Sequence, residues 1–463
     1  MFRTFLPLTF LFIAAIGLAQ DRPMLPESSS PTSGQQIVYT QSVEGQQSPT
    51  SSGKGPTLPQ GRIPNSSGPM ITLDQAIQYA LVNNTGLKAT KTQISQNQAQ
   101  EITANLRPNP TLSGDSQFLP IFHPSQFSSE TLDTLAQFDV GVGYLFERGA
   151  KRKRRLQAAR DTTEVTRAQV ADAERSLTFN VAQEFINALL AKSNLEFAAM
   201  DLESFQQTVN ISQERYKAGD ISEGDLLKIK LQLLTFQTDV AQAKVAKAQA
   251  LISLRQLMGY SSVAANYDVA GDLEFVPLRA GADDLQAVAL NVRPDLRAAR
   301  SGIVAAKSQM ALARANAKQD LTASMNFSHV SGASSASWFF SMPFPIFDRN
   351  QGEIKRTEYA AEQSNFAEIS AEETVMTDVR NAWETANSNQ AVVGLYTSGY
   401  LQQAQDSREI TDYAYKGGAA TLLDLLDAER SYRLVQLGYR QALANYMLSL
   451  EQLRQAVGTR SLP

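Results

Sequence analysis

The chain has 463 residues, with 42 lysines and arginines against 46 aspartates and glutamates, no cysteine and two histidines. The absence of cysteine excludes a disulfide framework, an iron–sulfur cluster, a thiolate zinc site, a cysteine nucleophile and a lipidated N-terminal cysteine. His123 and His329 are too few for a multi-histidine metal centre, and the balanced charge argues against a nucleic-acid partner. We expect no metal site, no cofactor and no enzymatic activity.

The N-terminus predicts export. Residues 1–19 combine Arg3, an apolar run from Phe5 to Ala15 and small residues at the end, as in a cleaved signal peptide; an uncleaved anchor is the alternative. No later run of about 18 apolar residues exists, so an integral membrane part would have to be a β-barrel. Residues 20–69 draw 31 of 50 positions from Pro, Ser, Gly and Gln, which predicts a disordered linker.

Proline distribution then outlines long helices. The segments 125–276 and 346–462 lack proline and are rich in strong helix formers. Apolar residues follow heptad spacing from Val181 to Tyr216 and again through Leu227, Leu231, Leu234 and onward to Ile252, which predicts coiled-coil seams. A helix from about Gly149 to Lys217 would be roughly 100 Å long, far beyond the needs of a compact domain.

Short alternating segments interrupt the helical pattern. Residues 138–146 and 321–327 place aromatic and aliphatic side chains on one face and small or polar ones on the other. The segment from Trp338 to Ile346 continues this alternation, with Pro343 and Pro345 on its second face. Such strands suit an outer-membrane barrel, although each alone also suits a soluble sheet.

The chain reads as a duplication. Residues 76–118 align with 285–327, and residues 216–227 align with 415–426. Each half therefore reads as helix, two strands, long helix, tight turn and long helix, with Gly219 and Gly418 at turns that favour a left-handed glycine. We expect a first repeat over 70–259, an equatorial linker over 260–281, a second repeat over 282–458 and a tail over 459–463.

Together these segments resemble the TolC family of outer-membrane efflux proteins. The resemblance rests on ITLDQAIQYALVNNTGLKATKTQISQNQAQEITANLRPNPTL, on its partner LQAVALNVRPDLRAAR, and on the tips RYKAGDISEGDLLKIKLQL and AYKGGAATLLDLLDAERSY. PFPIFDRNQGEIKRTEYA further resembles the branch that serves cobalt–zinc–cadmium-type pumps. The implied fold is mainly α, with duplicated antiparallel coiled-coil hairpins and four strands per chain. A homotrimer would close a 12-stranded outer-membrane barrel above a helical periplasmic tunnel.

The resemblance also implies functional positions. Asp424 and Asp427 match an acidic pair that lines the periplasmic aperture, and Tyr415 matches a gate-region tyrosine, whereas Ala420 replaces an arginine often found nearby. A solvated helix face is the alternative. For Asp424, an interaction with the helix dipole is a second alternative, because Asp225, its equivalent in the first repeat, also lies in the first turn of the helix after a tip. The tips are expected to touch a periplasmic adaptor through Lys217, Gly219, Asp220, Gly418 and Ala419.

A basic run follows the second strand. It consists of Lys151, Arg152, Lys153, Arg154 and Arg155. We expect these side chains at the inner rim of the outer membrane, near anionic lipid headgroups, or else on an ordinary solvated face. The two histidines are expected in exposed loops at the far ends of the strands, where a metal role is the less favoured interpretation.

The implied function is a non-enzymatic exit duct in the outer membrane. It would receive small molecules or metal ions from an inner-membrane pump through a periplasmic adaptor, or membrane fusion, protein. Two alternatives remain open at this point: an exit duct for type I protein secretion, and a periplasmic coiled-coil scaffold. Exposed aromatic strand faces argue against the scaffold, because they would meet water instead of lipid. The sequence names neither the substrate nor the pump.

Overall fold

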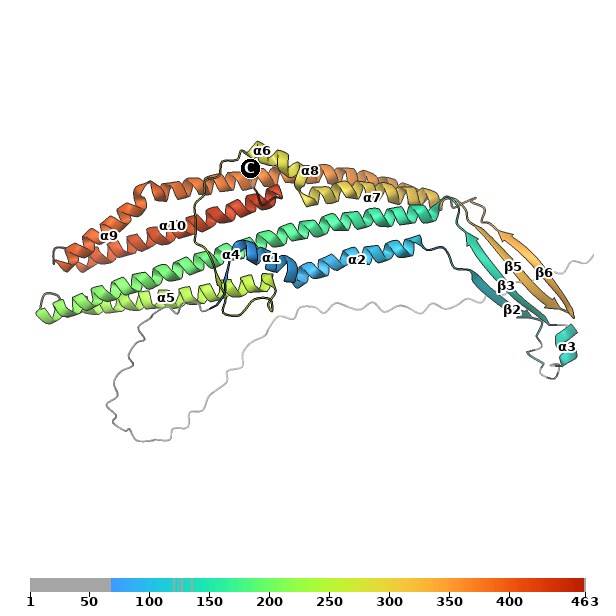
Figure 1. The fold of residues 1–463 in the computed structure, drawn as a ribbon, viewed down its shortest axis with the longest axis horizontal. Helices are drawn as coiled ribbons and strands as arrows, with labels where there is room; N and C mark the ends of the chain where they lie inside the picture. Colours follow the sequence, from blue (N-terminus) through green and yellow to red (C-terminus); the bar gives the residue numbers. More distant parts are fainter. Residues whose placement is uncertain (1–67, 120, 124, 126–127, 135, 462–463) are drawn as a thin grey trace, which may run out of the picture. The chain divides into compact units, whose positions relative to one another are not determined.

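The computed structural model describes residues 68–461, except 120, 124, 126–127 and 135. The expected signal peptide over 1–19 and nearly all of the expected linker over 20–69 lie outside the described residues. The described part joins one four-stranded sheet to a set of long helices (Figure 1).

The sheet is antiparallel and combines both halves of the chain. Its strands are β2 (Thr111–Gln117), β3 (Gln137–Phe146), β5 (Leu321–Val330) and β6 (Ala333–Ser341), in the order β2-β3-β5-β6. A short helix, α3 (Ser129–Thr134), lies between β2 and β3. The register sets one row of apolar side chains across all four strands, and each of them is exposed: Leu112, Val142, Met325 and Trp338.

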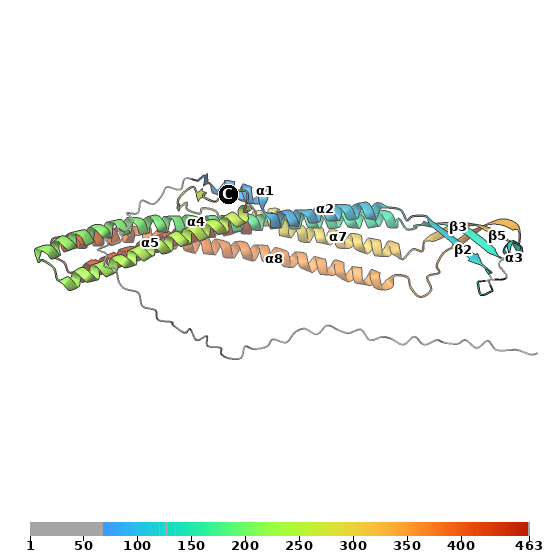
Figure 2. The ribbon, with the colours of Figure 1, turned by 90° about the horizontal axis from the view of Figure 1, so that it is seen from below.

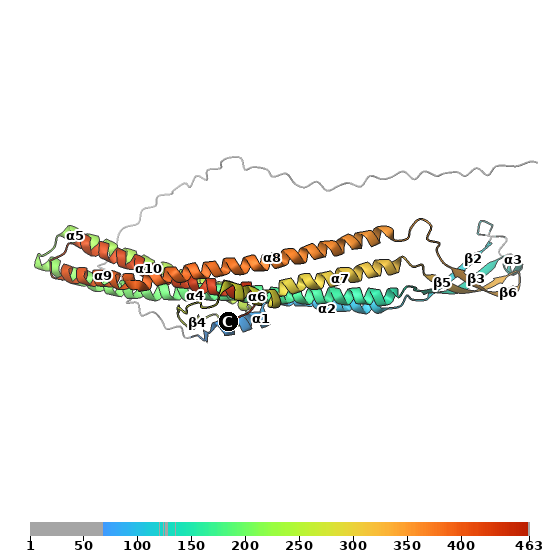
Figure 3. The ribbon, with the colours of Figure 1, turned by 90° about the horizontal axis from the view of Figure 1, so that it is seen from above.

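Two helical hairpins extend from this sheet. The first consists of α4 (Lys151–Ala218) and α5 (Glu223–Met258). The second consists of α8 (Gln351–Leu395), a π-helical turn η2 (Tyr396–Tyr400), α9 (Leu401–Lys416) and the returning helix α10 (Leu422–Val457). Helix α10 packs against α8, α9 and α4, so the two hairpins lie side by side (Figures 1 and 3).

Shorter helices complete each half. The first half contains α1 (Leu73–Asn83) and α2 (Thr85–Asn105), and the second contains α6 (Ala282–Val292) and α7 (Pro294–Asn316). Helices α2 and α7 both pack on α4 and run with it toward the sheet (Figure 2). Helices α2 and α7 therefore cover the part of α4 next to the sheet, and α5 packs on the part of α4 that leads to the tip.

Two similar cores hold the middle of the bundle. One joins Ala76 and Ala80 of α1 to Val181 and Phe185 of α4. The other joins Leu285 and Ala289 of α6 to residues of α8 and α10. A two-residue parallel pairing, β1 (Met70–Ile71) with β4 (Asp268–Val269), fastens the start of the described chain to the segment between the halves. No pattern in the sequence predicts this second sheet.

Several predicted elements are confirmed and three need correction. Helix α4 agrees with the predicted 149–217 within two residues, and the three alternating segments lie in strands β3, β5 and β6, with β2 as the fourth strand. Strand β6, however, ends at Ser341 and does not reach Ile346, because Pro343 and Pro345 lack the N–H groups that a ladder needs. The long helix expected before the second tip, in the proline-free segment 346–462, is interrupted at η2, where Gly399 has φ 127°.

The third correction concerns the predicted seam of α5. Leu226, Ile229 and Phe236 are buried within the chain, whereas the predicted stripe is exposed in it: Leu227, Leu231, Leu234, Val245 and Ile252. Helix α5 is apolar on more than one face, so heptad spacing could not select the face that meets α4. Among the described residues no helix is both long and apolar enough to cross a membrane.

Candidate functional site at the hairpin tips

Both hairpins turn through the same backbone motif. After α4, the N–H of Gly219 donates to the carbonyl of Tyr216 and that of Asp220 to the carbonyl of Arg215. After α9, the N–H groups of Gly418 and Ala419 donate to the carbonyls of Tyr415 and Ala414 in the same pattern. This is the Schellman motif, and its left-handed position explains the two glycines, with φ 87° and 77°. The prediction for these glycines is confirmed.

The helices that leave the tips begin with matching caps. Ser222 accepts a hydrogen bond from the N–H of Asp225 at 3.1 Å, and Thr421 accepts one from the N–H of Asp424 at 3.2 Å. The carboxylate of Asp424 also accepts from the N–H of Thr421 at 2.9 Å, which completes a capping box. Hydrogen bonds from Thr421 lower the pKa of Asp424. Asp424 therefore has a structural role at the start of α10, in agreement with the alternative interpretation that it interacts with the helix N-terminus.

Asp427 is placed differently. It lies one turn after Asp424 on α10 and is exposed. It forms no hydrogen bond or ion pair with the residues that the structure describes, so its carboxylate is available to solvent or to another chain. The structure thus separates the two members of the acidic pair, because one is engaged in a cap and the other is not.

Tyr415 links the two hairpins near their tips. Its side chain is 3% exposed, and its hydroxyl lies 3.2 Å from the hydroxyl of Ser212 on α4. Arg215, also on α4, donates to the carbonyl of Tyr415 at 2.6 Å and places its guanidinium 5.1 Å from the centre of the tyrosine ring. Phe205, Ile229 and other apolar residues of both hairpins pack around this contact.

Arg215 is a functional candidate that the sequence analysis missed. The family pattern drew attention to Ala420, where an arginine is absent, but an arginine of the other hairpin binds the tyrosine instead. A Cβ atom at Gly418 would lie 3.5 Å from the Arg215 guanidinium, which is an ordinary contact, so the left-handed backbone and not the space explains this glycine. The repeat alignment pairs Tyr216 with Tyr415, so Arg215 precedes the equivalent of the gate-region tyrosine, and this correspondence could have drawn attention to it.

The tip side chains are mostly exposed. Lys217 forms an ion pair with Glu214 three residues earlier, at 2.7 Å. Asp220 and Ala419 contribute the N–H groups of the turns, while Asp220 leaves its side chain exposed. Lys416 pairs with Asp412 in the same way at the second tip, so the tips differ mainly in the turn itself, where the first presents Asp220 and the second presents Ala419.

The basic run at 151–155 is divided by its contacts. Lys151 pairs with Asp320 at 2.7 Å, and Arg155 pairs with Glu147 at 2.7 Å and donates to the carbonyls of Ala104 and Leu106. These two residues fix the entry of α4 beneath the sheet. The other three basic side chains form no ion pair with described residues and remain for outside partners: Arg152, Lys153 and Arg154.

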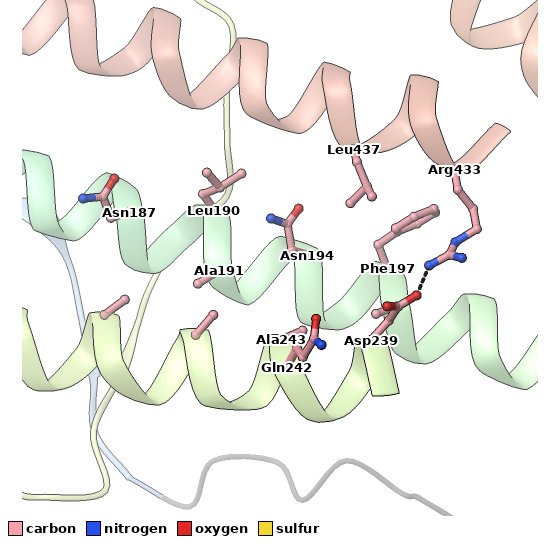
Figure 4. A pocket seen from close by; sticks show the side chains of 13 residues that line it. Asn187, Leu190, Ala191, Asn194, Phe197, Asp239, Gln242, Ala243, Arg433 and Leu437 are labelled. Carbon is pink, nitrogen blue, oxygen red and sulfur yellow. Dashed lines mark hydrogen bonds and ion pairs between the residues drawn. The ribbon is translucent and has the colours of Figure 1, made fainter. Parts of the chain in front are cut away.

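Further from the tips, a buried charge cluster joins α4 and α5 of the first hairpin to α9 and α10 of the second. Asp201 of α4 is 2.9 Å from Arg433 of α10, and Arg408 of α9 is 2.8 Å from Glu429 of α10. Arg433 also pairs with Asp239 of α5 (Figure 4). Both residues line a cleft of about 520 Å³ between α4, α5 and α10. We call these five residues the Asp201 cluster.

The expectation of exposed loops is confirmed for His123 and wrong for His329, because β5 extends through that position. His329 lies in β5 with its Nδ1 3.1 Å from the hydroxyl of Ser334, and His123 is exposed between β2 and β3. Across the described ranges, no group of three or more His, Cys, Asp or Glu side chains is arranged to hold a metal ion.

Comparison with known proteins adds a family. The family model for outer membrane efflux proteins matches residues 76–260 and 285–459. The cobalt-zinc-cadmium resistance protein CzcC of Cupriavidus metallidurans is 24% identical over 415 residues, covering 89% of this chain and 93% of the relative. The cation efflux system protein CusC of Escherichia coli K12 is 26% identical over 370 residues, covering 77% and 79%.

A pyoverdine export protein and two solved structures are also similar to this chain. The pyoverdine export outer membrane protein OpmQ of Pseudomonas aeruginosa is 25% identical over 413 residues, covering 83% of each chain. A crystal structure of CusC superposes with a TM-score of 0.69 at 21% identity, covering 84% of this chain and 92% of that one. The open state of the Neisseria gonorrhoeae MtrE channel gives 0.65 at 20% identity, covering 84% and 89%.

Proposed function

The chain belongs to the outer membrane efflux protein family, and on this premise we propose that three copies form the exit duct of a tripartite efflux system. It is an efflux protein of the outer membrane and not an enzyme. The observation that carries the proposal is the family match over both halves, on a fold of two long hairpins joined to one sheet. We also propose the repeat boundaries at 70–259 and 282–458, with a linker over 260–281 and a tail over 459–463.

Two features of the single chain support a trimer. The outer strands β2 and β6 each have one edge without a partner in the described sheet, and four strands cannot close a barrel. Pairing β6 of one copy with β2 of the next would give twelve strands in three copies. The exposed stripe of α5, with Leu231 68% exposed, would then be covered by a neighbouring copy.

We propose that Asp424, Asp427 and Tyr415 lie at the periplasmic aperture. Threefold repetition would turn Asp427 into a ring of carboxylates that attracts cations. Asp424 would contribute charge while it caps α10, since its lowered pKa keeps it ionised. Tyr415, held by Arg215 and Ser212, would keep the second hairpin against the first when the aperture is closed.

The ends of the assembly would contact other molecules. We propose that Lys217, Gly219, Asp220, Gly418 and Ala419 dock a periplasmic adaptor protein, which links the duct to an inner-membrane pump. Exposed turns at the ends of hairpins suit such docking. At the other end, Arg152, Lys153 and Arg154 would face anionic headgroups of the outer membrane, while Lys151 and Arg155 hold the helix entry.

The cargo is proposed from the relatives. One of them is named for cobalt, zinc and cadmium resistance, one for cation efflux and one for pyoverdine export. We propose a metal ion or small-molecule cargo for this chain. The exposed apolar row on the sheet, which includes Trp338, gives no support to a periplasmic scaffold that stays in water.

Two experiments test the proposal. Native mass spectrometry of the mature protein, extracted from the outer membrane in detergent, should give the mass of three chains; a monomer in the periplasmic fraction would refute the duct. Deletion of the gene should lower tolerance to cobalt, zinc or cadmium salts, or raise cellular retention of a small-molecule cargo. Unchanged tolerance and retention together would refute the proposed cargo classes.

A further inference from the structure

The Asp201 cluster carries an unbalanced charge. It contains three carboxylates, those of Asp201, Asp239 and Glu429, and two guanidiniums, those of Arg408 and Arg433. With every group ionised, its net charge is −1. The groups facing Asp201 come from α5, α9 and α10. The guanidinium of Arg440, further along α10, interacts with both Asp201 and Glu196, so this pair adds one charge of each sign and leaves the balance at −1.

The excess charge is buried. Asp201 is 4% exposed and Glu429 6% exposed, and Arg408 lies between them, 4.0 Å from the first and 2.8 Å from the second. A buried charge without full compensation is costly, and a buried carboxylic acid avoids the cost by keeping its proton. Burial first, and then the negative charge of Glu429, raise the pKa of Asp201 to about 6.

The cluster is also the main polar connection between the hairpins along this stretch. Arg408 reaches from α9 to Asp201 and donates to the hydroxyl of Ser204 on α4 at 2.7 Å. Arg433 reaches from α10 to Asp201 on α4 and to Asp239 on α5. Any movement of the second hairpin away from the first has to separate these groups.

A natural pivot lies on the sheet side of the cluster. At η2 the backbone of Gly399 leaves the helical region, and the axis bends between α8 and α9 (Figure 1). Tyr396, in the same turn, lies against Gly438 of α10, where a Cβ atom would come within 2.5 Å of the tyrosine hydroxyl. Helix α9 can therefore swing about η2 while α8 stays packed on α7.

We propose that the Asp201 cluster is a proton-controlled link between the two hairpins. With a proton on Asp201, two carboxylates face two guanidiniums, and α9 and α10 stay against α4. With Asp201 ionised, the excess negative charge weakens the link and α9 swings about η2. The link is inferred from the contacts within one chain. The further step, in which its release widens the periplasmic end of the duct, rests on the proposed function.

Distance measurement between the hairpins tests the link directly. Because the chain has no cysteine, Lys230→Cys on α5 and Tyr413→Cys on α9, both exposed, can carry two spin labels in the full-length protein. Labelled chains diluted into unlabelled ones would report distances within one chain. We expect a short distance to dominate at pH 5. At pH 7.5 the population with a longer distance should be at least threefold larger than at pH 5, and the change should have its midpoint near pH 6.

Variants separate the titrating group from general effects. Asp201→Asn should keep the short distance at both pH values, and Asp239→Asn, which balances the charges without touching Asp201, should do so too. Glu203→Gln, at an exposed position two residues from Asp201, should behave as the unmodified chain. No pH effect in the unmodified chain, or the same effect in both aspartate variants, would overturn the proposal. Channel conductance in planar bilayers, measured separately, tests the duct and not the link.

Discussion

Removing Arg215 should loosen the tip of the second hairpin by a predictable amount. Arg215→Ala loses the hydrogen bond to the carbonyl of Tyr415 and the contact with its ring. A hydrogen bond from a charged donor contributes about 1.5–3 kcal/mol. The carbonyl keeps its bond from the N–H of Gly418, at 3.1 Å, so the lower end of that range applies. The cation–π contact adds about 0.5–1 kcal/mol.

The sum, about 2 kcal/mol, corresponds to a change of about 30-fold in a local opening equilibrium. Hydrogen exchange measured by mass spectrometry on peptides covering residues 409–426 would report it, because amides exchange through local opening. Lys217→Ala is the matched control, since its exposed ion pair with Glu214 contributes about 0.3 kcal/mol. Faster exchange by less than threefold, or by the same factor in both variants, would refute the assigned role of Arg215.

Further predictions concern pH, assembly and capping. Because the pKa of Asp201 is raised in the folded chain, its protonation contributes up to about 3 kcal/mol of stability below pH 3.8, and this contribution is lost as the pH rises through about 6. The Tm of Asp201→Asn should therefore change less between pH 4 and pH 7 than the Tm of the unmodified chain. Leu231→Glu on the exposed stripe should reduce the trimer fraction in native mass spectrometry while circular dichroism stays the same. Thr421→Ala should lower stability by about 1 kcal/mol in denaturant titration, and an unchanged midpoint would contradict the capping role.

The fold could be predicted largely because it is repetitive and locally encoded. Proline positions bounded the helices, the alternation of side chains marked the strands, and two glycines two hundred residues apart marked matching turns. These signals act over a few residues, so one sequence suffices to recognise them. The family resemblance added the assembly and the direction of transport, which no local pattern contains.

The candidate site was harder to predict because its contacts join distant segments. Arg215 and Tyr415 are 200 residues apart, as are Arg408 and Ser204 to within a few residues. Asp201 has no local signature, since an aspartate on a long polar helix is ordinary, and only packing reveals that it is buried. The bend at Gly399 was missed for the opposite reason: a single glycine within a helical pattern is usually tolerated without a break.

The matching turns at the two tips have a consequence for docking stoichiometry. One backbone motif presents two different surfaces. A lysine precedes each turn, Lys217 in the first and Lys416 in the second, but the exposed residue after the left-handed glycine is Asp220 in the first tip and Ala419 in the second. In the proposed trimer the periplasmic end would offer six turns of similar shape but alternating chemistry. A partner made of identical subunits would therefore find three equivalent binding sites of each kind. Six such subunits would bind as two classes of three, with different affinities.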